Sequence, residues 1–368
     1  MIPVSSPTSV LLAGGGSAGH VSPLLALADA LVRRHPGITV TALGTEVGLE
    51  ARLVPARGFD LRYVPKVPLP RRPSADLFRL PGRLKEAVVA AGRAIDETRA
   101  EVVVGFGGYV STPAYLAARR RRIPIVIHEQ NARPGLANRL GARWTPYVAT
   151  TFSRTRLPRA RRIGMPLRRE ITQLDRAANR PEALEHFRLE ADLPTVLVTG
   201  GSLGAQRLND AFAASAERLS RGGVQVLHIT GLGKDFTPEV PEGGAPYRVV
   251  PYADRMELAY AAAGLVVARS GANTVCELTA VGLPAVYVPL PIGNGEQRLN
   301  ATDVVAAGGG ILVEDVAMTP EWVQAHVLPL ATDDEQLARM TQAAARLGER
   351  AADEALADLV DEAWRSRR

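Results

Sequence analysis

The sequence predicts an α/β protein of two Rossmann-like domains, each with a doubly wound parallel sheet. Three observations lead to this prediction. The chain has 368 residues, and a single hydrophobic core usually stops growing at about 250 to 300 residues. Near-continuous apolar runs alternate with helix-like segments, which is typical of parallel sheets covered on both faces. Two stretches of the N-terminal half also return, in the same order, in the C-terminal half.

The elements of the N-terminal half follow this alternation in order. Residues 9–14 predict a strand, a helix follows from about residue 23 to 34, and residues 38–44 predict the next strand. Residues 101–106 and 123–129 predict two more. These runs are nearly free of polar side chains, so we expect strands that are buried on both faces.

The internal repeat is the most informative pattern. The segment "VLLAGGGSAGH" at Val10 returns as "VLVTGGSLGAQ" at Val196, and the segment that starts at Val102 returns at Leu265. Both members of the second pair read as a strand, a glycine turn, a helix and a strand led by proline. We therefore expect two similarly built lobes facing a cleft, and we expect the ligand in that cleft.

The join between the lobes is predicted within residues 153–170, where arginines and two prolines interrupt the pattern. This places an N-terminal domain at 1–165 and a C-terminal domain at 166–347. The remaining segment, 348–368, has apolar residues at helical spacing that must pack on a neighbour. They are Leu356, Leu359, Val360, Ala363 and Trp364.

Composition and charge restrict the compartment and the partners. The formal net charge is +6, which favours anionic partners such as nucleic acid, an acidic membrane surface or a phosphorylated substrate. Cys276 is the only cysteine, so no internal disulfide can form. We see neither a signal peptide nor an apolar run of the roughly 18 residues that span a bilayer, so we expect a cytoplasmic protein.

The first glycine loop fits the dinucleotide fingerprint through Gly14, Gly16 and Gly19. Glycines allow a tight turn, and the helix that follows aims free N–H groups at an anion. NAD binding would also need an acidic residue at the end of the second strand. That strand ends in "TALGTE", with Glu46 beyond its end, so we expect another phosphate compound.

The second loop, around Gly200 and Ser202, offers a similar anion site. Two such loops facing each other across a cleft favour a diphosphate ligand. The chain has no Asp-x-Asp motif and no histidine pair at metal-ligand spacing. We therefore expect no metal and no cofactor.

Two side chains are candidates for chemistry on the residues alone. His20 is in the first turn of a predicted helix, where the dipole lowers the pKa of the ring and keeps it a neutral base; a packed or capping histidine is the alternative. Glu277 lies inside the predicted helix after "SGANTV", one or two turns beyond a glycine loop. That position suits a carboxylate that binds a ribose diol, and a plain surface acid is the alternative.

Five motifs, present in order, give the chain a resemblance to a known family. They are "GGGSAGHVSP", "HEQNARPG", "GMPLR", "GGSLGA" and "RSGANTVCELTAVGLPAVYVPLP…GEQRLNA". Together they resemble the MurG family of N-acetylglucosaminyltransferases, glycosyltransferase family 28. The resemblance implies the GT-B fold, with the last helix, in 348–368, returning to the N-terminal domain.

The resemblance also implies a reaction and a location. GlcNAc would pass from UDP-GlcNAc to the 4-hydroxyl of MurNAc in undecaprenyl-diphosphate-MurNAc-pentapeptide, with inversion and without a metal or cofactor. The enzyme would be peripheral on the cytoplasmic face of the bacterial membrane, in cell wall synthesis and thus in cell shape and division, with no nucleic acid partner. Rivals are another GT-B glycosyltransferase, a UDP-GlcNAc 2-epimerase, and a non-catalytic partner subunit that keeps the fold.

The resemblance implies site residues by their positions in the motifs. His20 would be the general base, with Glu129 as the second choice. Gly107, Gly108 and Tyr109 would contact the acceptor. The residues expected at UDP-GlcNAc are Ser17, Ala18, Gly19, Asn131, Arg168, Ser202, Ala253, Ala272, Asn273, Thr274, Glu277 and Gln297. Glu296 replaces the first glutamine of a pair that many relatives have.

Apolar and basic residues alternate within residues 66–88, which suits an anionic membrane surface. The alternative is an ordinary loop and helix packed on the N-terminal domain. The residues predicted to contact the membrane are Leu69, Leu77, Phe78, Leu80, Arg72 and Arg79.

Overall fold

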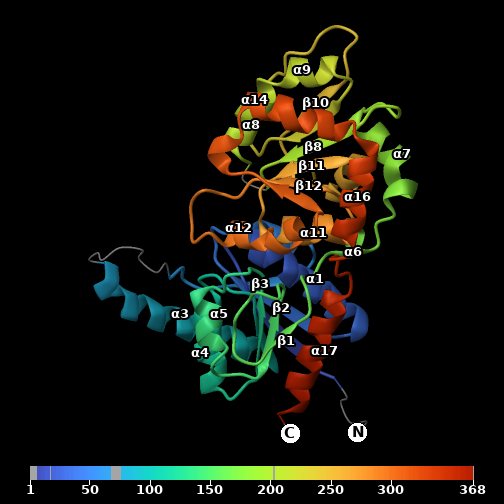
Figure 1. The fold of residues 1–368 in the computed structure, drawn as a ribbon. Coiled ribbons are helices and arrows are strands. Elements are labelled where there is room, and N and C mark those ends of the chain that lie inside the picture. Colours follow the sequence, from blue (N-terminus) through green and yellow to red (C-terminus); the bar gives the residue numbers. More distant parts are fainter. Residues whose placement is uncertain (1–5, 17, 68–75, 202–203, 368) are drawn as a thin grey trace. The chain divides into compact units, whose positions relative to one another are not determined.

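The chain forms two compact units, each built on its own parallel sheet (Figure 1). The N-terminal unit comprises Met1–Arg168 and Ala351–Arg368, and the C-terminal unit comprises Arg169–Arg350. The two doubly wound sheets confirm the predicted fold class. The computed structural model describes residues 6–16, 18–67, 76–201 and 204–367.

The sheet of the N-terminal unit has the strand order β3-β2-β1-β4-β5-β6-β7, and every pair is parallel. Its strands are β1 (Ser9–Ala13), β2 (Thr39–Gly44), β3 (Asp60–Tyr63), β4 (Val102–Gly105), β5 (Ile125–Glu129), β6 (Tyr147–Thr150) and β7 (Ala160–Arg162). The order reverses between β1 and β4, where Val10 lies opposite Val102. Open α/β sheets bind ligands outside the carboxyl ends of the strands at such a switch point.

Helices cover both faces of this sheet. They are α1 (Ala18–Arg34), α2 (Glu50–Ala56), α3 (Asp76–Thr98), α4 (Ser111–Arg120), α5 (Leu136–Gly141) and α17 (Ala352–Arg365). Side chains of β1 alternate between two core clusters. Val10 and Leu12 pack with α1 and α17, whereas Leu11 and Ala13 pack with α3 and α4. Both faces of the strand are buried, which explains its uninterrupted apolar run.

The C-terminal helix α17 lies beside α1 in the N-terminal unit (Figure 1). Leu356, Val360 and Trp364 belong to the same core cluster as the apolar face of α1. Arg33 at the end of α1 pairs with Asp353 at 2.8 Å. The predicted apolar stripe therefore packs on the N-terminal unit, as the resemblance implied.

The sheet of the C-terminal unit has the order β10-β9-β8-β11-β12-β13, again parallel throughout. Its strands are β8 (Thr195–Thr199), β9 (Gln225–Ile229), β10 (Tyr247–Val250), β11 (Leu265–Ala268), β12 (Ala285–Tyr287) and β13 (Gly310–Leu312). The switch point lies between β8 and β11. In sheet order β8 and β11 correspond to β1 and β4, so the internal repeat of the sequence is a repeat of the fold.

Helices and short turns connect these strands. They are α6 (Arg169–Thr172), α7 (Arg176–Phe187), α8 (Gln206–Ala213), α9 (Ala216–Arg221), α10 (Met256–Ala262), α11 (Ala272–Val281), α12 (Glu296–Asn300), α13 (Thr302–Ala306), η1 (Asp315–Ala317), α14 (Pro320–Trp322), η2 (Val323–Val327), α15 (Leu328–Ala331) and α16 (Asp334–Ala345). Among the helices of the described residues, none has the length and apolar character needed to cross a bilayer.

One local prediction was wrong, and another was incomplete. Helix α1 begins at Ala18 rather than near Pro23; the proline lies close to the helix start, where its missing N–H loses a single hydrogen bond. The segment 153–170 was expected to hold the join between the lobes, and the boundary between the two units does fall within it, after Arg168, but it also contains the edge strand β7, which was not predicted. That strand is mostly exposed and rich in arginine, so it lacks the apolar signal of a strand.

Candidate functional site

At three positions of the loop after β1, the local structure requires glycine. A β-carbon on Gly14 would meet Cβ of Phe106 at 3.1 Å, and one on Gly15 would meet Oε1 of Glu50 at 2.4 Å. Gly16 has a φ of +90°, which favours glycine. Its N–H donates to Oε2 of Glu50 at 2.9 Å. One donor of the predicted anion site is therefore occupied by a carboxylate of the chain itself.

His20 is half-buried in the first turn of α1. A β-carbon on Gly107 would lie 3.2 Å from its Nε2 and 3.4 Å from Nδ2 of Asn138, so the ring lies against the loop after β4. Burial lowers the pKa of the ring to about 4, and the negative charge of Glu50 opposes this shift. The pKa of His20 is lowered, as predicted, but the main cause is desolvation and not the helix dipole. At neutral pH the ring is uncharged and able to accept a proton.

The predicted acceptor-binding residues Gly107, Gly108 and Tyr109 lie at the same edge of the sheet. Gly107 and Gly108 have φ values of +90° and +78°. A β-carbon on Gly108 would approach the carbonyl oxygen of Gly15 at 2.6 Å. The loops after β1 and β4 therefore pack directly on each other and bring His20 beside the glycines.

Glu129, at the end of β5, is buried at 2% exposure. Its carboxylate accepts hydrogen bonds from the N–H of Asn131 at 3.0 Å, the N–H of Gly135 at 3.0 Å and Nδ2 of Asn138 at 2.9 Å. Burial raises the pKa of this carboxyl, and these hydrogen bonds oppose the rise. With both oxygens engaged, Glu129 holds the loop that carries Asn131, and this arrangement favours His20 as the base.

Several predicted residues lie outside what the structure describes. These are Ser17 and Ser202 of the two glycine loops, Leu69 and Arg72 of the predicted membrane segment, and the side chains of Ala18, Leu77, Phe78 and Arg79. Gly19 and Leu80 are half-buried, and so is Arg168, the last residue of the N-terminal unit before the chain enters α6.

The second glycine loop follows β8 in the C-terminal unit. A β-carbon on Gly200 would lie 2.1 Å from the backbone N of Ala205, and one on Gly204 would lie 2.0 Å from the carbonyl oxygen of Thr230. Gly201 and Gly204 both have positive φ, at +78° and +66°. Close packing and backbone conformation therefore both demand glycine in this turn.

The start of α11 lies after the neighbouring strand, β11. Ala272, Asn273 and Thr274 form its first turn, whose N–H groups have no partners within the helix. Arg269, just after β11, is buried and donates to the carbonyl oxygens of Val288 and Pro289, each at 3.2 Å. These hydrogen bonds tie the loop ahead of the helix to the end of the next strand.

Glu277 and Gln297 are both half-buried. Oε2 of Glu277 accepts a hydrogen bond of 2.7 Å from the hydroxyl of Tyr260, a buried residue of α10. Oε1 of Gln297 accepts one of 3.0 Å from the N–H of Leu290. The first bond orients the carboxylate of Glu277. The second occupies the amide oxygen of Gln297, whose NH₂ group is the donor of the same side chain.

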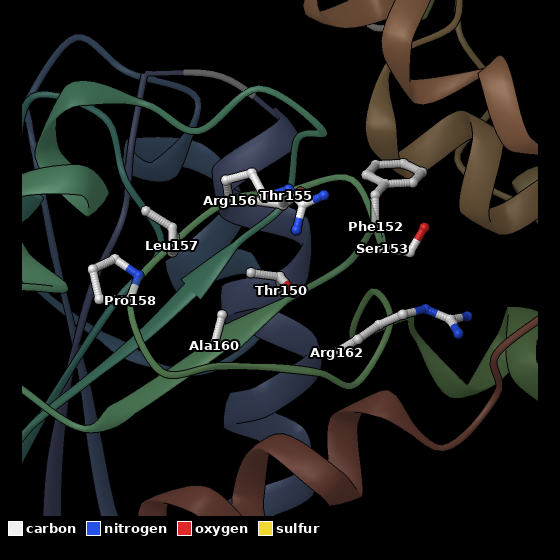
Figure 2. A pocket seen from close by; sticks show the side chains of 9 residues that line it. All are labelled: Thr150, Phe152, Ser153, Thr155, Arg156, Leu157, Pro158, Ala160 and Arg162. Atoms are coloured by element: carbon white, nitrogen blue, oxygen red, sulfur yellow. The ribbon is translucent and has the colours of Figure 1, made fainter.

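Two surface hollows lie apart from most of these residues. One of about 450 Å³ is lined by side chains around β6 and β7, among them Phe152, Arg156 and Arg162, and by none of the predicted site residues that the structure describes (Figure 2). The other, of about 600 Å³, lies in the C-terminal unit beside Ala253 and Arg248. Of the predicted donor-site residues that lie in the described part of the chain, Ala253 alone lines it.

Three contributors to these sites were not predicted from the sequence. Glu50 contacts the first loop from 34 residues further along the chain. Tyr260 and Arg269 orient their neighbours from α10 and from the end of β11. The arginine could have been suspected, because a charged residue directly follows an apolar strand. The other two are visible only once the chain is folded.

Family sequence models match both halves of the chain. The glycosyltransferase family 28 N-terminal domain matches residues 10–150, and the glycosyltransferase family 28 C-terminal domain matches residues 195–358. These two matches cover more than half of the chain.

Similar proteins extend the comparison over almost the full length. A protein of Streptomyces avermitilis named UDP-N-acetylglucosamine--N-acetylmuramyl-(pentapeptide) pyrophosphoryl-undecaprenol N-acetylglucosamine transferase is 56% identical, covering 97% of this chain and 99% of its own. A protein of the same name from Nocardioides is 58% identical over 95% of this chain and 97% of its own.

Solved structures show the same fold. MurG of Acinetobacter baumannii is 28% identical with a TM-score of 0.78, covering 97% of this chain and 100% of its own. A UDP-GlcNAc 2-epimerase from Neisseria meningitidis has a TM-score of 0.65 over 95% of this chain and 99% of its own. At 14% identity the epimerase shows likeness of fold only.

Proposed function

The chain belongs to glycosyltransferase family 28, and we propose that it transfers GlcNAc from UDP-GlcNAc to the 4-hydroxyl of MurNAc in undecaprenyl-diphosphate-MurNAc-pentapeptide. The reaction is a step of peptidoglycan synthesis. Its main support is the identity of 54–58% to proteins named for this transfer, over nearly the whole chain.

We assign the roles from where the candidate residues lie, which is at the carboxyl ends of the central strands of each sheet. In the N-terminal unit, His20 and Gly107 lie together at the switch point between β1 and β4. In the C-terminal unit, the start of α11 and Glu277 follow β11 at the corresponding switch point. The cluster in the N-terminal unit offers a neutral base, and the cluster in the C-terminal unit offers helix N–H groups and an oriented carboxylate.

The cluster in the C-terminal unit suits a nucleotide sugar. The N–H groups at the start of α11 would bind the diphosphate, with about 0.3 to 1 kcal/mol from the helix dipole and more where the site is partly buried. Glu277, held by Tyr260, would accept hydrogen bonds from the ribose hydroxyls. The NH₂ group of Gln297 would donate to the sugar, and the backbone of Ala253 would face the uracil.

The chemistry is a single displacement. His20 accepts the proton of the MurNAc hydroxyl while the oxygen attacks the anomeric carbon of GlcNAc. The bond from that carbon to the diphosphate oxygen breaks, UDP leaves with the bonding electrons, and the configuration inverts. The N–H groups of α11, with Ser202 and Arg168, stabilise the charge on the leaving group, and no metal takes part.

The test is incubation with UDP-GlcNAc and a short-chain lipid-diphosphate-MurNAc-pentapeptide, with and without a chelator. We expect the disaccharide product at the same rate in both reactions. Loss of product with the chelator would contradict metal independence. UDP-ManNAc formed without acceptor would identify an epimerase instead.

We also propose that the enzyme acts as a peripheral protein on the anionic, cytoplasmic face of the bacterial membrane. Support comes from the lipid acceptor and from the apolar and basic residues of segment 66–88. Charge reversal of Arg72 and Arg79 should weaken co-sedimentation with anionic vesicles, because each basic residue near such a surface contributes about 1 kcal/mol. Unchanged sedimentation would contradict the membrane role of this segment.

A further inference from the structure

Glu50 is a fully buried acid that the proposed reaction does not use. It is the first residue of α2, and its carboxylate accepts hydrogen bonds from Thr45 and Gly16. Oε1 accepts from the N–H of Thr45 at 2.9 Å and from its hydroxyl at 2.8 Å, and Oε2 accepts from the N–H of Gly16 at 2.9 Å. A buried carboxylate is costly unless it is satisfied in this way.

Three glycines enclose this carboxylate. A β-carbon on Gly15 or Gly44 would lie 2.4 Å from an atom of the Glu50 side chain, and one on Gly48 would lie 2.1 Å away. They come from the loop after β1, the end of β2 and the turn before α2. The backbone therefore forms a close-fitting site around this one side chain, which points to a role beyond filling space.

The carboxylate is connected to His20 in two ways. It holds Gly16, four residues ahead of His20 and two ahead of the start of α1. Its charge also acts on the ring, against the effect of burial. The ring and Nδ2 of Asn138 both lie within 3.4 Å of where a β-carbon on Gly107 would stand, and this Nδ2 donates to the carboxylate of Glu129.

We propose that Glu50 is a positioning residue for proton transfer: it fixes the first turn of α1, and with it the ring of His20, and stabilises the positive charge that the ring gains as a base. This inference rests on the proposed function in that His20 accepts the proton. Glu50 itself does not touch the substrate.

The test compares Glu50→Gln with Glu46→Gln. Both changes remove one negative charge, but Glu46 is exposed. The amide of Glu50→Gln is similar in shape yet places a donor against the N–H of Gly16 or of Thr45. We expect kcat to fall by about 10²-fold, as for a catalytic group displaced by about 1 Å, while the KM for UDP-GlcNAc stays the same. Glu46→Gln should match the wild type.

A second readout does not depend on transfer. NMR titration of the His20 ring should give a lower pKa in Glu50→Gln than in the wild type, because the charge that opposes the shift is gone, and no change in Glu46→Gln. Equal titration and equal kcat in the two variants would overturn the inference. If the wild type transfers no GlcNAc but the ring responds to Glu50, the proposed function fails and the link between Glu50 and His20 stands.

Thr45→Val covers the case in which Glu50→Gln does not fold. It removes one hydrogen bond to the carboxylate and keeps the charge. A thermal melt like that of the wild type, together with a kcat lowered by about tenfold, would support the inference. A wild-type kcat in this variant would overturn it.

Discussion

Replacing His20 with alanine is expected to lower kcat for GlcNAc transfer by about 10²- to 10⁴-fold, the usual contribution of a general base. The KM for UDP-GlcNAc should change little, because none of the proposed donor contacts is made by the ring of His20. Steady-state kinetics with saturating acceptor measures both constants. A kcat within a few fold of the wild type would rule out His20 as the base.

The pH dependence gives a second test of the same assignment. The base must be neutral, and burial lowers the pKa of the ring to about 4. In the wild type kcat/KM should therefore rise with pH through about 4 and be flat from there to neutrality. If the base were a histidine with an unshifted pKa, the rise in kcat/KM would lie near pH 6.5.

His326→Ala is the matched control for the His20 variant. His326 is exposed and stacks on Trp322 in the C-terminal unit, with a ring centroid distance of 4.5 Å. Its removal should leave kcat and the pH profile unchanged.

Replacing Glu277 with alanine is expected to raise the KM for UDP-GlcNAc by about 10- to 100-fold. This range corresponds to the roughly 1.5 to 3 kcal/mol of hydrogen bonds to a charged group. Tyr260→Phe should have a smaller effect in the same direction, because it removes the hydroxyl that orients the carboxylate at 2.7 Å but leaves the carboxylate in place.

A donor analogue that lacks both ribose hydroxyls shows whether the diol is the partner. The wild type should bind this analogue as weakly as Glu277→Ala binds UDP-GlcNAc, and Glu277→Ala should not distinguish the two donors. If the variant still prefers UDP-GlcNAc by the wild-type ratio, Glu277 does not bind the diol. Glu239→Ala, at an exposed acid of the same unit, should behave as the wild type.

The central strands of both sheets could be predicted from the sequence, because they are buried on both faces. The run Val10–Ala13 is fully buried, and its counterpart at β8 repeats the pattern. Edge strands β3 and β7 are mostly exposed, and their residues carry no such signal. The start of α1 was predicted near Pro23, although the glycine loop had placed His20 in the first turn of a helix; α1 begins at Ala18, in agreement with the loop.

The candidate site was predictable only where its residues share a motif. His20 and Glu277 each follow a glycine loop, so their neighbourhoods could be inferred from the chain. Glu50 could not be inferred, because α2 brings it to Gly16 by tertiary packing. Glu129 has the chemistry of a base, and only its burial and three hydrogen bonds show that it holds a loop.

The most direct test of the proposed transfer is the NMR structure of the product made by the wild-type enzyme from UDP-GlcNAc and the short-chain acceptor. The bond between GlcNAc and UDP in the donor is α, and direct displacement inverts the anomeric carbon. This displacement therefore predicts a β-linked GlcNAc on the 4-hydroxyl of MurNAc. An α-linked product, a different hydroxyl or free UDP-ManNAc would contradict it.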